Sequence, residues 1–328
     1  MSGHRGLTRT AARTVLHRAG GAVLVLWGAA TLGFLALHLV PGDPVATLLG
    51  GSVTTGSDTV RAEITREFGL DRPLWEQYAT FLGRLSGGDL GRSYQQQQPV
   101  SRIIGEQLGP TAALALTAFG LILLLALVSA VTTAGRRRAV RGAASGAELL
   151  AISTPPFWLG VLLLTLFSFH LRLFPVAGAD GWQSLVLPAV TLAVPFGSLL
   201  SQVLREGLES ALHEPFALTA RSRGIGPLAL RGRHALRHAL VPAVTLGGWL
   251  VGGLLGGTVL VETVFARPGL GRVALDAVTG HDLPVVIGLI LLSAAVYLVV
   301  NTVVDALYLL IDPRLRGGGA AAVREVAA

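Results

Sequence analysis

The 328-residue sequence contains no cysteine and no lysine, and only 14% of its residues are charged. The absence of cysteine excludes disulfide bonds and thiolate metal sites. The absence of lysine excludes an ordinary P-loop ATPase, because the Walker A loop needs its lysine on the nucleotide phosphates. A typical soluble protein has about 25% charged residues, whereas 52% of this chain is hydrophobic. The composition therefore favours a membrane protein.

Six apolar runs are long enough to cross a bilayer, which takes about 20 helical residues each. The first run indicates an anchor rather than a signal peptide, because no small-residue cleavage site precedes Pro41. We therefore expect an all-α membrane protein whose transmembrane domain, residues 21–311, lies between an N-terminal segment, residues 1–20, and a C-terminal tail, residues 312–328. The six predicted spans are Gly21–Val40, Thr111–Ala134, Leu149–Leu171, Leu185–Leu204, Pro242–Phe265 and Pro284–Ile311.

The 26 basic residues, all arginine, lie mainly in alternate segments between these runs. Because short loops rich in arginine stay in the cytoplasm, we expect both termini and the loop 205–241 to be cytoplasmic. The long loop 41–110 carries many of the acidic residues and is expected on the outer side. The positive charge thus follows membrane topology, and we expect no binding of nucleic acid.

The outer loop 41–110 shows helical patterns rather than the composition of a linker. A capped helix is predicted over Thr59–Phe68. A second helix follows Pro73, with apolar residues at three- and four-residue spacing, and Ser86-Gly87-Gly88 is expected to end it. A third short helix is predicted over Val100–Leu108, before Gly109-Pro110 restarts the chain as a span. The loop is therefore expected to form a small helical cap over the ends of the spans.

The fifth apolar run carries glycine at every fourth position, at Gly248, Gly252 and Gly256. Small residues in such a row let another helix backbone approach closely. The row could pack within this bundle, or it could contact a partner subunit along a conduction path. The sequence leaves both interpretations open.

The loop 205–241 contains the pattern of a short basic helix. Pro215 suits a first helical turn, and Glu214 favours the positive N-terminal end of a helix. Arg221 and Arg223 suit the C-terminal end, and Gly224 can adopt the left-handed conformation that ends many helices. We therefore expect a rigid basic helix on the cytoplasmic side of the membrane.

Beyond this helix, Gly226-Pro227 turns the chain into a predicted second helix, Leu228–Leu240, before Pro242 opens the fifth span. The order of residues in Thr219–Gly224 and in His234–Pro242 resembles the signature loop of permease subunits from binding-protein-dependent ABC importers, in the dipeptide/oligopeptide/nickel branch. In that family the loop is a coupling helix, which sits in a groove of the ATPase and transmits its closure to the spans.

The resemblance extends over nearly the whole chain, which makes it more specific than any single motif. The further matching segments are Leu39–Pro44, Gly69–Leu74, Gly88–Tyr94, Pro156–Gly160, Glu262–Phe265, Pro268–Arg272 and Asp312–Arg316.

Three residues of the loop depart from the family pattern. Leu218 replaces a frequent glutamate, Phe216 replaces an aromatic residue that often carries a hydroxyl, and His238 replaces a frequent asparagine. These changes leave the helix intact, but they remove polar groups that would contact the ATPase. The resemblance implies that the residues which couple this chain to an ATPase are Glu214, Phe216, Thr219, Ala220, Arg221, Arg223, Gly224, His234, Arg237 and Pro242.

The resemblance implies a transport subunit in a bacterial cell membrane, without an enzymatic site or a cofactor of its own. It would form half of the translocation pathway of an ATP-driven importer for dipeptides or oligopeptides, with nickel chelates or other small solutes as the alternative cargo. The implied partners are a second, homologous permease, two ATPase subunits, an extracytoplasmic solute-binding protein and the lipid bilayer.

A few polar residues in or near the spans are candidates for a function. Glu262 could face the pathway, or it could pair with Arg267 or Arg272. Asn301 and Asp305, one helical turn apart, are expected to form a structural pair or an interface rather than a proton relay. The remaining polar candidates are histidines at span ends, which are not expected to bind metal: His38 and His170.

Two other classes of function compete with the importer. A secondary transporter commonly has polar groups and broken helices near mid-membrane, and the polar content within these spans is low. Against a membrane scaffold without transport, the outer loop and the loop 205–241 argue only through the family resemblance. Hydrolase motifs such as His-Glu-x-x-His are absent from the sequence, which makes an enzyme a weak interpretation.

Overall fold

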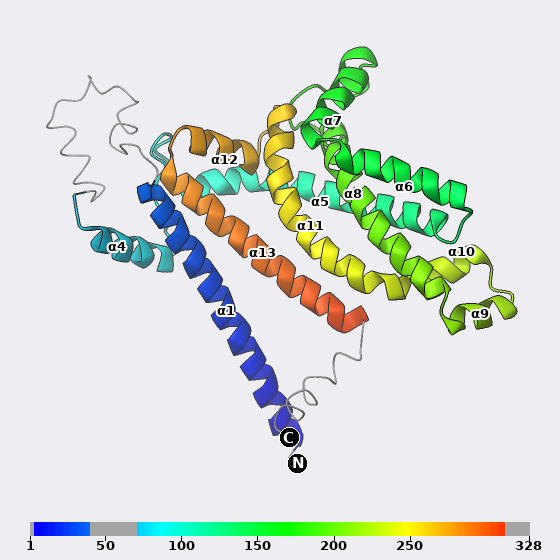
Figure 1. Cartoon of the computed structure of the whole chain (residues 1–328). Helices are drawn as coiled ribbons and strands as arrows, with labels where there is room; N and C mark the ends of the chain where they lie inside the picture. The colour runs from blue at the N-terminus through cyan, green and yellow to red at the C-terminus, as the bar shows by residue number, and fades with distance from the viewer. Residues whose placement is uncertain (1–2, 40–70, 312–328) are drawn as a thin grey trace. The chain divides into compact units, whose positions relative to one another are not determined.

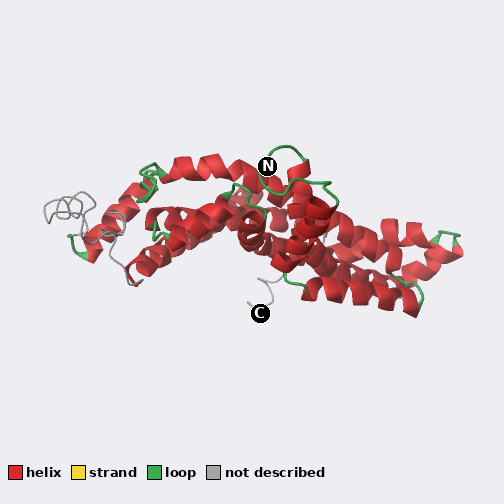
Figure 2. Ribbon diagram, turned by 90° about the horizontal axis from the view of Figure 1, so that it is seen from above, coloured by secondary structure: helices red, strands yellow, loops and turns green. Residues whose placement is uncertain are grey.

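The computed structural model describes residues 3–39 and 71–311. In these ranges the chain is almost entirely helical, and its only β-type pairing is an isolated bridge between Arg92 and Pro99 (Figure 2). The all-α prediction is confirmed. The predicted helix Thr59–Phe68 lies outside the described residues, as does the motif at Asp312–Arg316.

Five helical segments are long and apolar enough to cross a membrane, and a sixth span is formed if one bent pair of helices is counted (Figure 1). The prediction of about six spans is therefore confirmed. The five segments are α1 (Gly3–Leu39), α5 (Val100–Thr133), α8 (Gln183–Leu212), α13 (Leu283–Ile311) and a continuous run, Pro227–Val264, made of α10 (Pro227–Ala229), η2 (Leu230–Ala235) and α11 (Leu236–Val264).

The third predicted span is wrong in its shape. In place of one straight run over Leu149–Leu171, the chain forms α6 (Arg138–Ser153) and then α7 (Pro156–Leu163) with the π-helix η1 (Leu164–His170), bent by 98°. Thr154 is extended, with φ −82° and ψ 119°. A residue before proline is pushed out of the helical region, so Pro155 interrupts the helix and Pro156 starts the next one.

Two predicted helix breaks are also wrong. α5 runs through Gly109 and Pro110, and α11 runs through Pro242. A proline inside a helix removes one backbone hydrogen bond, and spans tolerate this where neighbouring helices accommodate the freed group. The start of α9 (Pro215–Ser222) and the end of α4 (Leu74–Ser86), by contrast, lie where the cap patterns predict them.

The chain divides into two compact units. Unit 1 comprises residues 1–108 and 273–298, and unit 2 comprises residues 109–272 and 299–328. In unit 1, α4 packs on α1: the rings of Phe34 and Phe81 stack at 5.6 Å, and the hydroxyls of Thr31 and Tyr78 are 2.7 Å apart. This packing agrees with the prediction of a helical cap.

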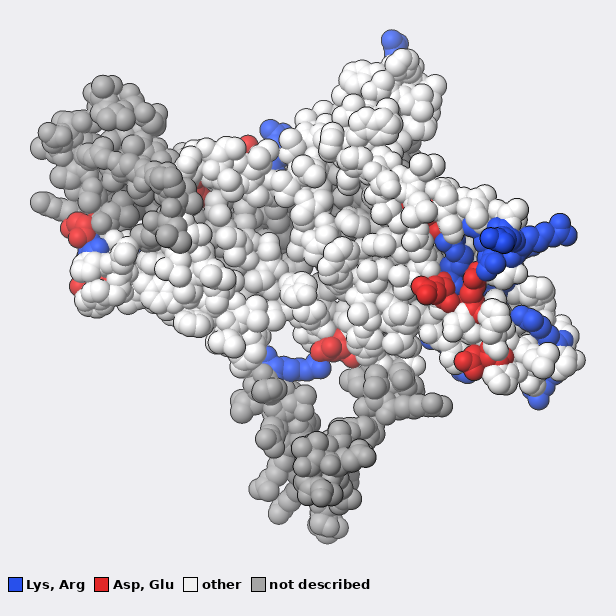
Figure 3. Space-filling model, in the orientation of Figure 1, with Lys and Arg blue, Asp and Glu red and all other residues white. Residues whose placement is uncertain are grey.

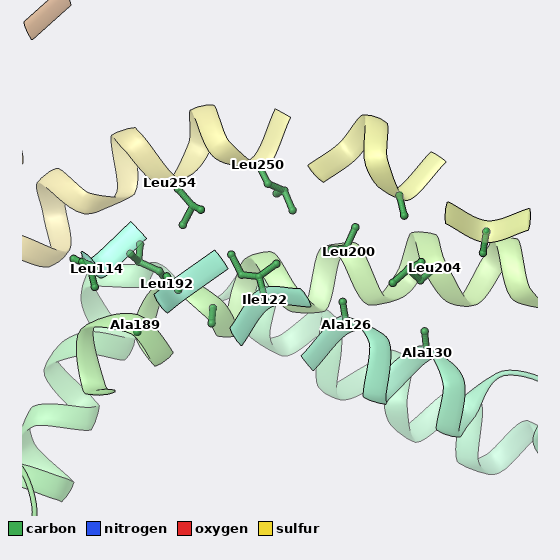
Figure 4. Packing of buried hydrophobic residues seen from close by; sticks show 14 of the residues in the cluster. Leu114, Ile122, Ala126, Ala130, Ala189, Leu192, Leu200, Leu204, Leu250 and Leu254 are labelled. Carbon is green, nitrogen blue, oxygen red and sulfur yellow. The ribbon is translucent and has the colours of Figure 1, made fainter. Parts of the chain in front are cut away.

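The core of unit 2 lies where α5, α8 and α11 meet (Figure 4). Small residues bring two of these backbones close together. A Cβ atom at Gly207 of α8 would lie 2.9 Å from the Cα atom of Ala239 on α11. This approach holds the end of α8 against the start of α11. In the chain, α9 lies between these two helices. The labelled core side chains in Figure 4 are Leu114, Ile122, Ala126, Ala130, Ala189, Leu192, Leu200, Leu204, Leu250 and Leu254.

Candidate functional site

The helix α9 follows α8 after a turn of two residues, His213 and Glu214. Glu214 is extended, with φ −70° and ψ 151°, and Pro215 occupies the first helical turn. The side chain of Glu214 makes no capping hydrogen bond, so its contribution to the helix end is its charge alone. α9 is therefore positioned by the short turn that joins it to α8.

The C-terminal end of α9 has the hydrogen bonds of a Schellman motif. The Ile225 amide donates to the Ala220 carbonyl at 3.1 Å, and the Gly224 amide donates to the Arg221 carbonyl at 3.0 Å. Gly224 has φ +76°, the left-handed conformation that this motif requires. The local prediction that Gly224 ends the helix is confirmed, and it explains why glycine stands there.

One face of α9 is packed against the rest of unit 2. Ala217 and Ala220 are buried and pack with Leu230 of η2. Beside them, the ring of Phe216 stacks on the ring of His238 in α11, with 5.0 Å between ring centroids and 20° between planes. Phe216 and His238, two of the three residues that depart from the family pattern, therefore contact each other. Their contact joins α9 to the start of α11.

The opposite face of α9 is open. Leu218 is 72% exposed, and Thr219, Arg221 and Arg223 are exposed beside it. Among the described residues, Arg221 and Arg223 form no ion pair. Charged side chains gather at this end of unit 2, around α6, α9 and α10 (Figure 3). An exposed apolar side chain on the same helix as two exposed cations suits a partner groove with an apolar floor and an acidic rim.

The other predicted coupling residues lie along η2 and α11. His234 is half-buried, with its Nδ1 atom 3.5 Å from the Ala229 carbonyl oxygen, and Arg237 is exposed. Pro242 lies inside the continuous helix, away from α9. Arg231, for which the sequence predicts no role, is buried. Its guanidinium donates to the Val131 carbonyl near the end of α5 at 3.0 Å. It ties η2 to α5.

The sequence patterns also do not predict a buried ion pair between α6 and α8. Arg205 of α8 and Glu148 of α6 form a two-pronged pair: Nη1 donates to Oε1 at 3.0 Å, and Nη2 donates to Oε2. Only 8% of the Arg205 side chain and 7% of the Glu148 side chain are exposed. The Glu148 carboxylate also accepts hydrogen bonds from Ser129 of α5, at 2.9 Å, and from Ser201 of α8, at 2.7 Å. One carboxylate thus joins three helices.

A sequence signal for this pair existed. Glu148 immediately precedes the predicted third span, and Arg205 immediately follows the predicted fourth span. A second pair joins the same two helices nearer the surface: Arg141 donates to Glu209 at 2.8 Å, and 41% and 26% of these side chains are exposed. The two ion pairs lie on the turns of α8 that lead to α9.

Glu262, near the other end of α11, is fully buried. Its carboxylate accepts a hydrogen bond from the Thr111 hydroxyl at 2.6 Å, from the Gly271 amide at 2.7 Å and from the Arg272 amide at 3.2 Å. The two amides belong to the first turn of α12 (Leu270–Thr279). A Cβ atom on Gly269 would collide with the carboxylate, so glycine is needed there.

This enclosure favours a structural role for Glu262 over contact with a solute. Neither predicted partner forms an ion pair with it among the described residues, since Arg272 contributes only its backbone amide. Arg267 instead points its guanidinium at Ser184, donating to the hydroxyl at 3.2 Å. Burial lowers the pKa of Arg267, and the nearby negative charge of Glu262 acts in the opposite direction.

The glycine row of α11 has two different environments. A Cβ atom on Gly248 would lie 2.9 Å from the Val304 side chain of α13, so Gly248 packs within unit 2. A Cβ atom on Gly252 or Gly256 would meet nothing within 4 Å. Packing within the bundle therefore accounts for Gly248 alone.

Other polar candidates lie apart from these clusters. Asn301 and Asp305 are exposed on α13. His170 is exposed, with its Nδ1 atom 2.7 Å from the Thr165 carbonyl oxygen, and the side chain of His38 lies outside the described residues. Within the described residues, no three histidine, aspartate or glutamate side chains come together as a metal site.

Two family models match the chain. The model of the binding-protein-dependent transport system inner membrane component matches residues 122–317, and the model of the N-terminal region of such membrane components matches residues 11–115. The first match contains α9 and both ion pairs described above. Together the two models match most residues of both compact units.

Individual relatives align over almost their whole length. A Brucella abortus (strain 2308) protein named as a peptide transport system permease is 38% identical over 311 residues, covering 92% of this chain and 98% of the relative. The glutathione transport system permease protein GsiC of Salmonella choleraesuis (strain SC-B67) is 35% identical over 303 residues, with the same coverage. A solved structure of the MetNI methionine ABC transporter, at 19% identity and a TM-score of 0.48, covers 65% of this chain and 96% of its own, a likeness too distant for a functional argument.

Proposed function

The chain belongs to the family of binding-protein-dependent transport system inner membrane components, and we propose that it is the permease subunit of an ATP-driven importer for peptides. The substrate class rests on the Brucella and Salmonella relatives, which are named for peptide and glutathione transport. The partners would be a second homologous permease, two ATPase subunits and an extracytoplasmic solute-binding protein. Together with this chain they would form one complex in the lipid bilayer.

The observation that carries the proposal is the geometry of α9. It is a rigid helix, closed by a Schellman motif and packed on one face only. Its other face presents Leu218 together with Arg221 and Arg223, which form no ion pair within the part of the chain that the structure describes. This helix occupies the stretch in which the chain resembles the coupling loop of ABC importer permeases.

The proposed mechanism follows from how α9 is held. ATP binding would close the two ATPases and draw the two coupling helices of the complex toward each other. The short turn 213–214 passes that displacement to α8, and the Phe216–His238 stack passes it to α11. The bundle would thereby change from inward- to outward-facing. ATP favours the closed state of the ATPase subunits and so shifts the conformational equilibrium of the whole complex.

The orientation is part of the proposal. With both termini and α9 in the cytoplasm, a reporter fused after Ala328 will be active on the cytoplasmic side. A tag inserted near Gly87, at the end of α4, will react with an impermeant reagent from outside. Protection of that tag in intact cells would contradict the orientation.

Gly224→Val tests the role of α9. The substitution forces a β-branched residue into φ +76°, at a cost of about 1–3 kcal/mol, and distorts the end of α9. The variant is expected to insert normally and to lose solute-stimulated ATP hydrolysis in the reconstituted complex. The matched control is Gly226→Val, two residues away, where φ is −64° and a Cβ atom meets nothing within 4 Å.

The energy source gives a second test. The chain alone is expected neither to bind ATP nor to transport solute in proteoliposomes. The full complex is expected to take up peptide in the presence of ATP, and an uncoupler should not abolish the uptake. Uptake by the isolated chain that collapses with the proton gradient would instead favour a secondary transporter.

A further inference from the structure

The buried side chains of Arg205 and Glu148 form further hydrogen bonds besides their ion pair. The guanidinium of Arg205 also approaches the Thr133 hydroxyl, at 3.3 Å, and the Ser145 hydroxyl, at 3.3 Å. The Glu148 carboxylate accepts from Ser129 as well. Within the described residues, each side-chain hydrogen bond of the pair is thus with a hydroxyl or with the opposite charge, and these bonds are distributed over α5, α6 and α8.

The position of the pair along α8 gives it a mechanical consequence. Arg205 lies seven residues before Leu212, the last residue of α8, which corresponds to about 10 Å of helix. The two-residue turn 213–214 then leads directly into α9. Any displacement of α9 along the direction of α8 therefore reaches Arg205 through this two-residue turn and two helical turns.

We propose that the Arg205–Glu148 pair is a positioning element that couples α9 to α5 and α6. With the pair intact, the three helices move as one block when α9 is displaced, and the movement reaches the 98° bend between α6 and α7. Without the pair, α8 moves and α6 lags behind. This inference rests on the proposed function, because it requires α9 to be the helix that the ATPase displaces.

A purely structural role makes a different prediction. Apolar residues of similar volume commonly replace a buried ion pair without loss of stability, whereas removal of one partner is strongly destabilising. The double variant Glu148→Leu/Arg205→Met removes both charges and therefore separates the two roles. If the pair only fills the core, this variant will behave like the wild type. If the pair positions α6, the variant will be stable but poorly coupled.

The experiment compares three complexes in proteoliposomes, each with the full set of permease, ATPase and binding-protein subunits and a dipeptide as the probe. They carry the wild-type chain, Glu148→Leu/Arg205→Met, or the control Arg141→Gln/Glu209→Gln. The control removes the half-buried, more accessible ion pair between the same two helices. The readout is the amount of peptide taken up per ATP hydrolysed, together with the amount of assembled complex.

The buried-pair variant is expected to assemble, to hydrolyse ATP, and to lose uptake per ATP by about two- to thirtyfold, the range that corresponds to typical coupling energies. The control is expected to keep the wild-type ratio. An unchanged ratio in the buried-pair variant would overturn the inference, and so would its failure to assemble, since the pair would then be a stability element. Absence of peptide-stimulated hydrolysis in the wild-type complex would instead contradict the proposed function.

Discussion

Two buried glutamates of unit 2 show two ways of enclosing a carboxylate. Glu148, on α6, faces a guanidinium and hydroxyl groups, all of them side chains. Glu262, near the end of α11, faces one hydroxyl and two backbone amides. The first is an ion pair between helices, and the second is a cap on the first turn of α12.

The difference determines which neighbouring residues can be changed. Side-chain partners leave the backbone free, and a Cβ atom on Gly146, two residues before Glu148, would meet nothing within 4 Å. Backbone partners must come close to the carboxylate, so the chain near Glu262 needs glycine at Gly269 and Gly271. The ion pair joins helices through side chains and leaves the path of the backbone free, whereas the cap is part of that path.

The largest effect is expected for Glu148→Gln, which leaves Arg205 buried without its counter-charge. The free energy of unfolding of the purified chain in detergent should fall by about 3–5 kcal/mol. The control Glu209→Gln breaks the half-buried pair with Arg141, which is more exposed than the Arg205–Glu148 pair, and should cost about 0–1 kcal/mol. Denaturant unfolding followed by tryptophan fluorescence measures both. Equal losses would show that burial does not distinguish the two pairs.

Gly271→Ala should break the cap while Glu262 itself stays unchanged, although the new Cβ atom would also lie 2.8 Å from the carboxylate. The new Cβ atom would lie 2.5 Å from the Cα atom of Val259, so a backbone must shift, at a cost of about 1–3 kcal/mol. Gly146→Ala has the opposite expected sign, because alanine in a helix is more favourable than glycine by up to about 1 kcal/mol. Thermal unfolding in detergent compares the two. A similar loss at both positions would remove the distinction between side-chain and backbone partners.

Glu262→Gln should cost less than Glu148→Gln. The amide keeps an oxygen that accepts from the Gly271 amide and leaves no strong counter-charge behind, so about 1–2 kcal/mol is expected from the weaker hydrogen bonds. The same denaturant experiment measures it. A loss at Glu262 as large as that at Glu148 would mean that the charge of Arg267 forms a true pair with Glu262.

The smallest effect concerns the helix end beside Glu262. α11 ends in a Schellman motif like that of α9, since the Arg267 amide donates to the Glu262 carbonyl at 2.8 Å. Its left-handed residue is Ala266, with φ +45°, where α9 has Gly224. Ala266→Gly relieves strain of about 1–2 kcal/mol and loses part of that gain to backbone entropy. A net stabilisation of about 0.5 kcal/mol is expected in thermal unfolding, and a destabilisation would show that the strain is absent.

Local patterns predicted those features whose causes lie within a few residues of one another. The start of α9 at Pro215 and its end at Gly224 follow from backbone geometry that proline and glycine impose directly. The end of α4 at Ser86, before two glycines, has the same kind of cause. The prediction that Pro110 and Pro242 break helices failed, because packing in the bundle outweighs a local preference.

The amino-acid sequence by itself determined the all-helical class, the approximate number of spans and the capped helix α9, since apolar run length, periodicity and caps act over short distances along the chain. Only the tertiary structure decided which polar side chains meet. Glu148 and Arg205 are 57 positions apart, and Phe216 and His238 lie on different helices. Such meetings depend on how each helix is rotated about its own axis, and that rotation is set by the packing of the whole unit rather than by any local pattern.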